Sequence, residues 1–133
     1  MIGDRSLRLP ASGGFMEKET DISCKYFAHM VFFQLLDLSD PAVDAFLDYC
    51  VRYLSGHDGQ VHFSLGLRAV NIHRDVSDSS FDVAMHIVFK NRGKYDDYAA
   101  SQQHADFITD TAGMSTGRRV SDSYIERAVV GLP

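Results

Sequence analysis

The alternation of apolar and polar residues predicts four strands. The first strand is predicted over residues 26–36, which are dense in β-branched and aromatic side chains. The second and third strands are predicted over 61–72 and 81–90, joined by a polar hairpin loop at 74–80. A fourth strand with weaker alternation is predicted over 119–129.

Two helical regions are predicted between these strands. Ser39 and Pro41 supply an N-cap and a first-turn proline, and Gly56 supplies a left-handed stop. The apolar residues at helical spacing within this first helix are Val43, Phe46, Leu47, Cys50, Val51 and Leu54. The second helical region is predicted over 95–111 and is ended by Gly113. The order is therefore β-α-β-β-α-β, the ferredoxin-like arrangement with a four-stranded antiparallel sheet.

The parity of the strand residues assigns them to the two faces of the sheet. Right-handed crossovers place both helices on one face. The side chains predicted to line an apolar chamber between that face and the helices are His29, Val31, Phe33, Phe46, Leu47, Cys50, Val83, Met85 and Ile87. The opposite face would be bare, and its residues are Met30, Phe32, Ala84, His86 and Val88. Because soluble monomers rarely expose so large an apolar patch, this face is predicted to bury about 1,500 Å² against a second copy of the chain.

Length and charge restrict the class of protein. A chain of 133 residues with 45% hydrophobic residues fits one globular domain, predicted over 24–130. The net charge of −5 argues against a nucleic-acid partner, and the pair Arg118 and Arg119 is interpreted as a solvated loop end. No apolar run approaches the 18 residues of a membrane helix, and no secretory signal is recognised. We therefore expect a cytoplasmic protein with free cysteines and no membrane partner.

The first 23 residues are polar and without periodicity, and are predicted to be a flexible extension. Two interpretations stay open. In the first, translation starts at Met16 and residues 1–15 are not part of the protein. In the second, the segment is a flexible arm that lies over a partner subunit.

The third strand runs through a polar break at 90–93 into a segment that carries Tyr98, His104 and Phe107. A neutral imidazole with a pKa of about 6.5 accepts a proton near neutral pH, and a phenol donates a hydrogen bond to a carbonyl that gains charge. On a continuous helix, six residues place Tyr98 and His104 roughly 120° apart. A restart of the helix with Ser101 as N-cap would let the two side chains converge.

This segment resembles the stress-responsive A/B barrel (Dabb) family, whose members read Tyr-x-x-His-Pro-x-His followed by an aromatic residue. Tyr98, His104 and Phe107 stand at the matching offsets, whereas Ser101 and Gln102 replace the first His and the Pro of the pattern. The resemblance implies a dimeric α/β barrel with a ligand pocket between sheet and helices. It also implies acid–base roles for the matched Tyr and His, which related members use in aldol-type cyclisation of a polyketide chain.

Together these observations predict a pocket for a small apolar molecule and, as one reading, a cofactor-independent lyase or cyclase. As the resemblance implies, His104 would be the base, Tyr98 the hydrogen-bond donor, and His29 a polar contact. Phe107 would line the ligand pocket. Two alternatives stay open: a non-catalytic stress or ligand-binding module in which Tyr98 and His104 are structural, and a cofactor-free monooxygenase of the same barrel type. No cofactor is expected. A metal site is not expected either, because His62 and other histidines lack ligand spacing.

Overall fold

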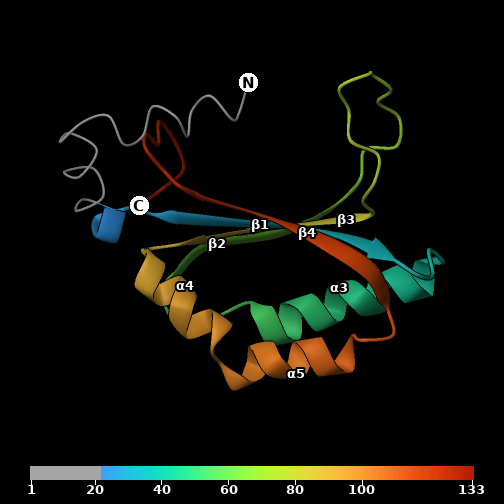
Figure 1. Cartoon of the computed structure of the whole chain (residues 1–133), viewed down its shortest axis with the longest axis horizontal. Helices are drawn as coiled ribbons and strands as arrows, with labels where there is room; N and C mark the ends of the chain where they lie inside the picture. Colours follow the sequence, from blue (N-terminus) through green and yellow to red (C-terminus); the bar gives the residue numbers. More distant parts are fainter. Residues whose placement is uncertain (1–21) are drawn as a thin grey trace, which may run out of the picture.

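The computed structural model describes residues 22–133, which fold into one sheet with the helices on a single side (Figure 1). The predicted extension and Met16 lie in the part outside these residues, except for residues 22 and 23. The elements in chain order are η2 (Ile22–Cys24), β1 (Phe27–Leu35), α3 (Asp40–Leu54), β2 (Gln60–Leu67), β3 (Val83–Phe89), α4 (Arg92–Ala99), α5 (Gln102–Asp110) and β4 (Ser115–Tyr124). The predicted β-α-β-β-α-β order is confirmed, with the second helical region divided in two.

The sheet has the order β2-β3-β1-β4 and every neighbouring pair is antiparallel. β1 and β3 form its centre, and all residues of β3 except His86 are buried. The helices cover one face of these two central strands, which explains the apolar side chains on that face. The ferredoxin-like α+β fold is confirmed.

The helices pack on one face of the sheet, with α3 and α5 side by side (Figure 1). Phe46, Cys50 and Leu54 follow one another at four-residue spacing on α3 and are buried in the core. Val51 was predicted to belong to this stripe, and that prediction is wrong because its side chain is 50% exposed. It follows Cys50 directly and therefore points about 100° away from the buried line. Among residues 22–133, no helix has the length and apolar character needed to cross a bilayer.

The second helical region breaks between Ala99 and Gln102 rather than running straight. Asn91 caps α4 by accepting a hydrogen bond from the backbone of Lys94 at 2.9 Å. Ser101 caps α5 with its side-chain oxygen, which accepts from the backbone N–H of His104 at 3.1 Å. The restart at Ser101 is thus confirmed, without the proline that the family pattern carries at this point.

Two strand boundaries differ from the prediction. β2 ends at Leu67 rather than residue 72, because its partner β3 begins at Val83, the residue paired with Leu67. β4 covers Ser115–Tyr124 rather than 119–129, because it pairs with β1 along its whole length. Both boundaries are determined by the partner strand and not by the alternation within the segment.

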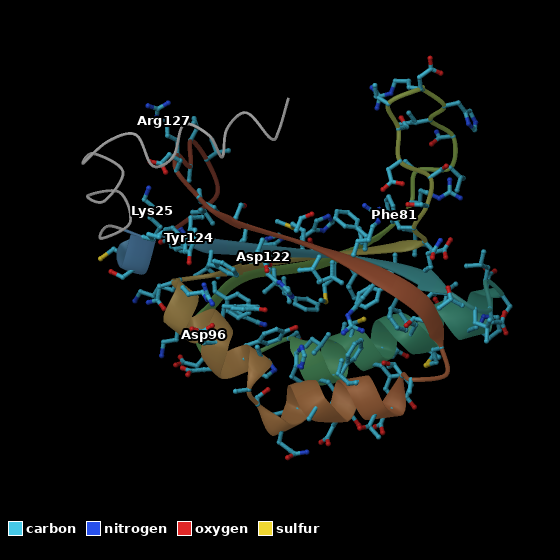
Figure 2. All side chains as sticks on the ribbon, in the orientation of Figure 1. Lys25, Phe81, Asp96, Asp122, Tyr124 and Arg127 are labelled. Carbon is cyan, nitrogen blue, oxygen red and sulfur yellow. The ribbon has the colours of Figure 1, made fainter. Side chains whose placement is uncertain are left out.

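The face of the sheet opposite the helices is only partly bare. Ala84 and Val88 are buried within the single chain, so the prediction of a bare patch is wrong for these two. Ala84 is paired with Phe32 on β1, and Val88 is paired with His62 on β2, so larger side chains flank both small ones. Phe32 contacts Phe81 at the base of the β2–β3 loop, with 5.1 Å between ring centroids (Figure 2).

Candidate functional site

Ser101 brings Tyr98 and His104 together at the break between α4 and α5. Its hydroxyl donates to the carbonyl oxygen of Tyr98 at 2.7 Å and accepts from the backbone N–H of His104 at 3.1 Å. The change of direction places the two rings edge to face, with centroids 5.1 Å apart. A straight helix would have separated them by roughly 120°, so the cap creates the pair.

A cavity of about 170 Å³ lies beside this pair, between the sheet and the helices. The residues that line it are His29, Val31, Phe33, Leu54, Met85, Tyr95, Tyr98, Ala99, His104, Phe107, Ile108, Arg118 and Val120. Seven of the predicted site residues are among them, including both members of the pair. The cavity is smaller than a drug-sized pocket of about 300 Å³, and an apolar cavity of about 150 Å³ is enough for benzene. The volume of this cavity is therefore sufficient for a ligand portion the size of one small ring.

The remaining predicted chamber residues do not line this cavity. They belong to or pack against the core instead, and they are Phe46, Leu47, Cys50, Val83 and Ile87. Burial raises the pKa of the Cys50 thiol to about 12, so this cysteine is an inert thiol in the core. The prediction that these five residues line the chamber with the others is wrong for this cavity, because α3 packs directly on the sheet there.

Tyr98 is the buried hydrogen-bond donor of the site. Its side chain is 2% exposed, and its hydroxyl has no hydrogen-bond partner among residues 22–133. The imidazole of His57 contacts the ring edge to face at 5.0 Å, and the ring of His29 lies at 6.1 Å. Burial is the main cause that raises the pKa of the Tyr98 phenol above 10, so it remains protonated. No residue among 22–133 accepts a hydrogen bond from this buried, protonated hydroxyl, and Tyr98 lines the cavity.

His104 is the candidate base. Burial is the main cause that lowers its pKa below the ordinary value of 6.5, and Coulomb interactions with His29, Arg118 and His57 lower it further. A neutral imidazole has a lone pair that can accept a proton. His104 therefore stays neutral, and ready to act as a base, below the pH at which a free histidine becomes charged.

His29 is held in place by a carboxylate that the sequence analysis did not identify. Its Nδ1 lies 2.6 Å from Oδ1 of Asp122, the residue paired with His29 across β1 and β4. In the neutral ring, Nδ1–H donates to the carboxylate, which leaves Nε2 as the acceptor. The only signal in the sequence was an acidic residue on β4 that lies on the same face of the sheet as His29. The two residues meet through the pairing of β4 with β1, which are far apart in the sequence.

The pair Arg118 and Arg119 is also placed differently from the prediction. Both residues lie within β4 rather than in a loop. Arg118 is on the helix side and lines the cavity. Arg119 is on the other side, where its guanidinium binds Asp78 and lies 5.5 Å from the centre of the Phe32 ring.

A second set of histidines lies on the open face. Oγ of Ser64 is 2.9 Å from Nε2 of His62 and 3.1 Å from Nδ1 of His86. His62 and His86 are thus linked through one hydroxyl. In the part of the chain that the structure describes, no three His, Cys, Asp or Glu side chains are grouped as metal ligands would be.

Solved structures with the same fold include three with TM-scores of 0.62 to 0.63. A Dabb family protein with a ferredoxin-like fold from Mesorhizobium loti has a TM-score of 0.62 and 22% identity, covering 74% of this chain and 95% of its own. A dimeric ferredoxin-like protein from Thermobifida fusca has a TM-score of 0.62 and 12% identity, covering 76% and 92%. Hydroxynitrile lyase from Passiflora edulis has a TM-score of 0.63 and 14% identity, covering 80% and 99%. At these identities the likeness shows the fold alone.

No match is found among curated proteins. The family model of the stress responsive A/B barrel domain matches residues 27–125, from the start of β1 to just beyond β4. This match covers the sheet, all three α-helices and every residue of the Tyr98–His104 site. The chain belongs to the stress responsive A/B barrel (Dabb) domain family.

Proposed function

We propose that this protein is a cofactor-independent acid–base enzyme that acts on a small carbonyl compound, as a lyase or a cyclase. The observation that carries this proposal is the buried Tyr98 hydroxyl, which has no hydrogen-bond partner among the described residues and belongs to a side chain that lines the same cavity as His104. A buried hydroxyl without a partner costs about 1–3 kcal/mol. Such a cost is understandable where a substrate oxygen completes the hydrogen bond.

In the proposed reaction, His104 accepts a proton from a carbon or oxygen next to the substrate carbonyl. Tyr98 donates a hydrogen bond to the carbonyl oxygen as negative charge develops on it. His29, oriented by Asp122, provides a second polar contact. In a cyclase, the enolate carbon forms a C–C bond to a second carbonyl carbon of the same molecule, and His104 returns its proton to the alkoxide oxygen that results. In a lyase the steps run in reverse: His104 takes the hydroxyl proton, the C–C bond breaks, and the proton returns to carbon. Neither direction needs a cofactor. A protein named hydroxynitrile lyase shares the fold, which supports lyase chemistry as one of the two reactions proposed.

The size of the cavity limits the substrate. About 170 Å³ holds a body of one small ring or a short chain. A longer polyketide-like chain would have to extend out of the cavity past the edge strand β4, where Val120 is 48% exposed. We therefore expect short substrates or the reactive end of a longer one.

A ligand-binding thermal-shift screen tests this proposal, using wild type, His104→Ala and the control His73→Ala. His73 is an exposed histidine on the β2–β3 loop and does not line the cavity. The panel contains small polyketide-like acids, quinones, fatty acids and haem. A compound that binds the native state raises the melting temperature of wild type and of His73→Ala but not that of His104→Ala. Absence of any hit, with His104→Ala itself several degrees less stable, would instead make His104 structural and the protein a non-catalytic module.

We propose further that two copies of the chain pack through the open faces of their sheets, forming a dimeric α/β barrel. The remaining apolar residues of this face include Met30 and Phe32, and one solved structure of the same fold is described as dimeric. Light scattering after size-exclusion chromatography should give twice the chain mass of 14.9 kDa. Phe32→Asp should give monomer or aggregate, whereas Val51→Asp, on the helix side, should remain dimeric. A soluble, unchanged dimer of Phe32→Asp would contradict this interface.

A further inference from the structure

The edge strand β4 presents three alternating residues to the helix side of the sheet. Arg118, Val120 and Asp122 are paired with Phe33, Val31 and His29 of β1, respectively. Asp122 is used by His29, and Val120 lines the cavity. Arg118 lines the cavity as well, and its side chain is not a proton donor or acceptor in the proposed reaction.

Two hollows meet at Arg118. The cavity of about 170 Å³ beside Tyr98 adjoins a second, more open hollow of about 280 Å³ towards the α5–β4 loop. The residues that line both are Phe33, Phe107, Ile108 and Arg118. Among the described residues that line the two hollows, Arg118 is the one with a permanent charge, and it is exposed to solvent.

The guanidinium of Arg118 has no ion-pair partner in the part of the chain that the structure describes. No carboxylate within residues 22–133 forms an ion pair with it, whereas the neighbouring Arg119 binds Asp78 on the opposite face. Arg119 therefore binds the β2–β3 loop, while Arg118 lies beside the cavity without an ion-pair partner among the described residues. Its charge reaches the site, since it contributes to the low pKa of His104.

We propose that Arg118 binds the carboxylate of a small organic acid whose apolar body occupies the cavity beside Tyr98 and His104. This inference rests on the proposed function and names the class of its substrate. The planar guanidinium donates two parallel hydrogen bonds to a carboxylate, a geometry that a neutral ligand cannot reproduce. The acid end lies at the opening and the reacting end lies inside.

Binding of the acid would also change the base. A carboxylate on Arg118 neutralises the positive charge that now opposes protonation of His104. The pKa of His104 should therefore rise when the acid is bound, which makes the imidazole a stronger base only in the complex. This change can be measured apart from turnover.

Matched acid–amide pairs test the proposal by titration calorimetry on the full chain. The probes are hexanoate with hexanamide, and 3-phenylpropanoate with 3-phenylpropanamide. Wild type should bind each acid about 10-fold more tightly than its amide, as expected for a charge-assisted hydrogen bond. Arg118→Gln should reduce the affinity for the acid to that for the amide, and the affinity for the amide should stay the same as in wild type. Arg119→Gln, which removes the same charge on the other face, should keep the preference.

The outcomes separate the two proposals. Equal binding of acid and amide by wild type, or a preference that survives in Arg118→Gln, overturns the role of Arg118 and leaves the cavity as a binding site. Binding of neither probe pair at millimolar concentration overturns both. As an independent readout, NMR titration of the His104 ring in wild type should show a higher pKa with 3-phenylpropanoate than with the amide. An unchanged pKa in the acid complex also overturns the role of Arg118.

Discussion

Replacing Tyr98 with phenylalanine should stabilise the fold while removing the proposed activity. Tyr98 is 2% exposed, and its hydroxyl has no partner among the described residues. Desolvation without a hydrogen bond costs about 1–3 kcal/mol, which Tyr98→Phe removes. The lost oxygen leaves a space that costs only a few tenths of a kcal/mol at about 24 cal/mol per Å³. The net effect is a gain of about 1 kcal/mol or more in the free energy of unfolding.

For a domain of this size, about 1 kcal/mol corresponds to a rise of roughly 3–5 °C in melting temperature. Differential scanning calorimetry of the ligand-free protein measures it, and urea unfolding gives the free energy directly. Tyr53→Phe is the matched control, because the Tyr53 hydroxyl donates to Asp110 at 2.5 Å on the surface. This control loses a hydrogen bond and should melt at the same temperature as wild type or slightly lower.

The opposite sign would refute the reasoning. If Tyr98→Phe melts several degrees below wild type, the hydroxyl has a partner in the folded protein and Tyr98 is a structural residue. The proposed function would then lose the observation on which it rests. Greater stability combined with unchanged turnover of an identified substrate would instead exclude Tyr98 from the chemistry.

Three further changes test the parts around Tyr98. In wild type the pKa of His104 is lower in the folded state than in the unfolded chain, so the free energy of unfolding falls as the pH drops below about 6.5. In His104→Gln the melting temperature should depend less on pH between about pH 7 and pH 5. An equally steep pH dependence in the variant would contradict the low pKa. Ser101→Ala removes the cap of α5 and should cost about 1 kcal/mol in urea unfolding, with Ser79→Ala on the exposed loop as a control near zero; no loss would mean that the break does not depend on the cap. Asp122→Ala should change the tautomer of His29 from Nδ1–H to a mixture in ¹⁵N NMR spectra, and a single unchanged tautomer would show that the carboxylate does not orient the ring.

The centre of the fold could be predicted from the sequence because its signals are local. β1 and β3 are apolar on both faces, and Ser39 and Pro41 mark the start of α3. The ends of β2 and β4 could not be predicted, since each stops where its partner strand stops. Alternation within β4 is weak because most of this edge strand is exposed.

The site could be predicted where a motif in one segment, or the alternation within β1 and β3, identifies the residues, as with His29 and Met85. Tyr98 and His104 are six residues apart on α4 and α5, and the motif identified both. Asp122 and Arg118 join the site through the register of β4 against β1, a pairing between distant parts of the chain. Which apolar residues line a cavity and which fill the core, as with Phe46, depends on atomic packing that periodicity does not resolve.

Proton transfer at carbon is the most direct test of the central claim that Tyr98 and His104 form an acid–base site. The protein is incubated in D₂O with a panel of small keto acids, and loss of the α-proton signals is followed by NMR. The account predicts that wild type accelerates exchange for at least one acid, and that His104→Gln and Tyr98→Phe each reduce the rate by about 10²–10⁴-fold. Exchange at the solvent rate for every compound, or a wild-type rate in both variants, would contradict the account.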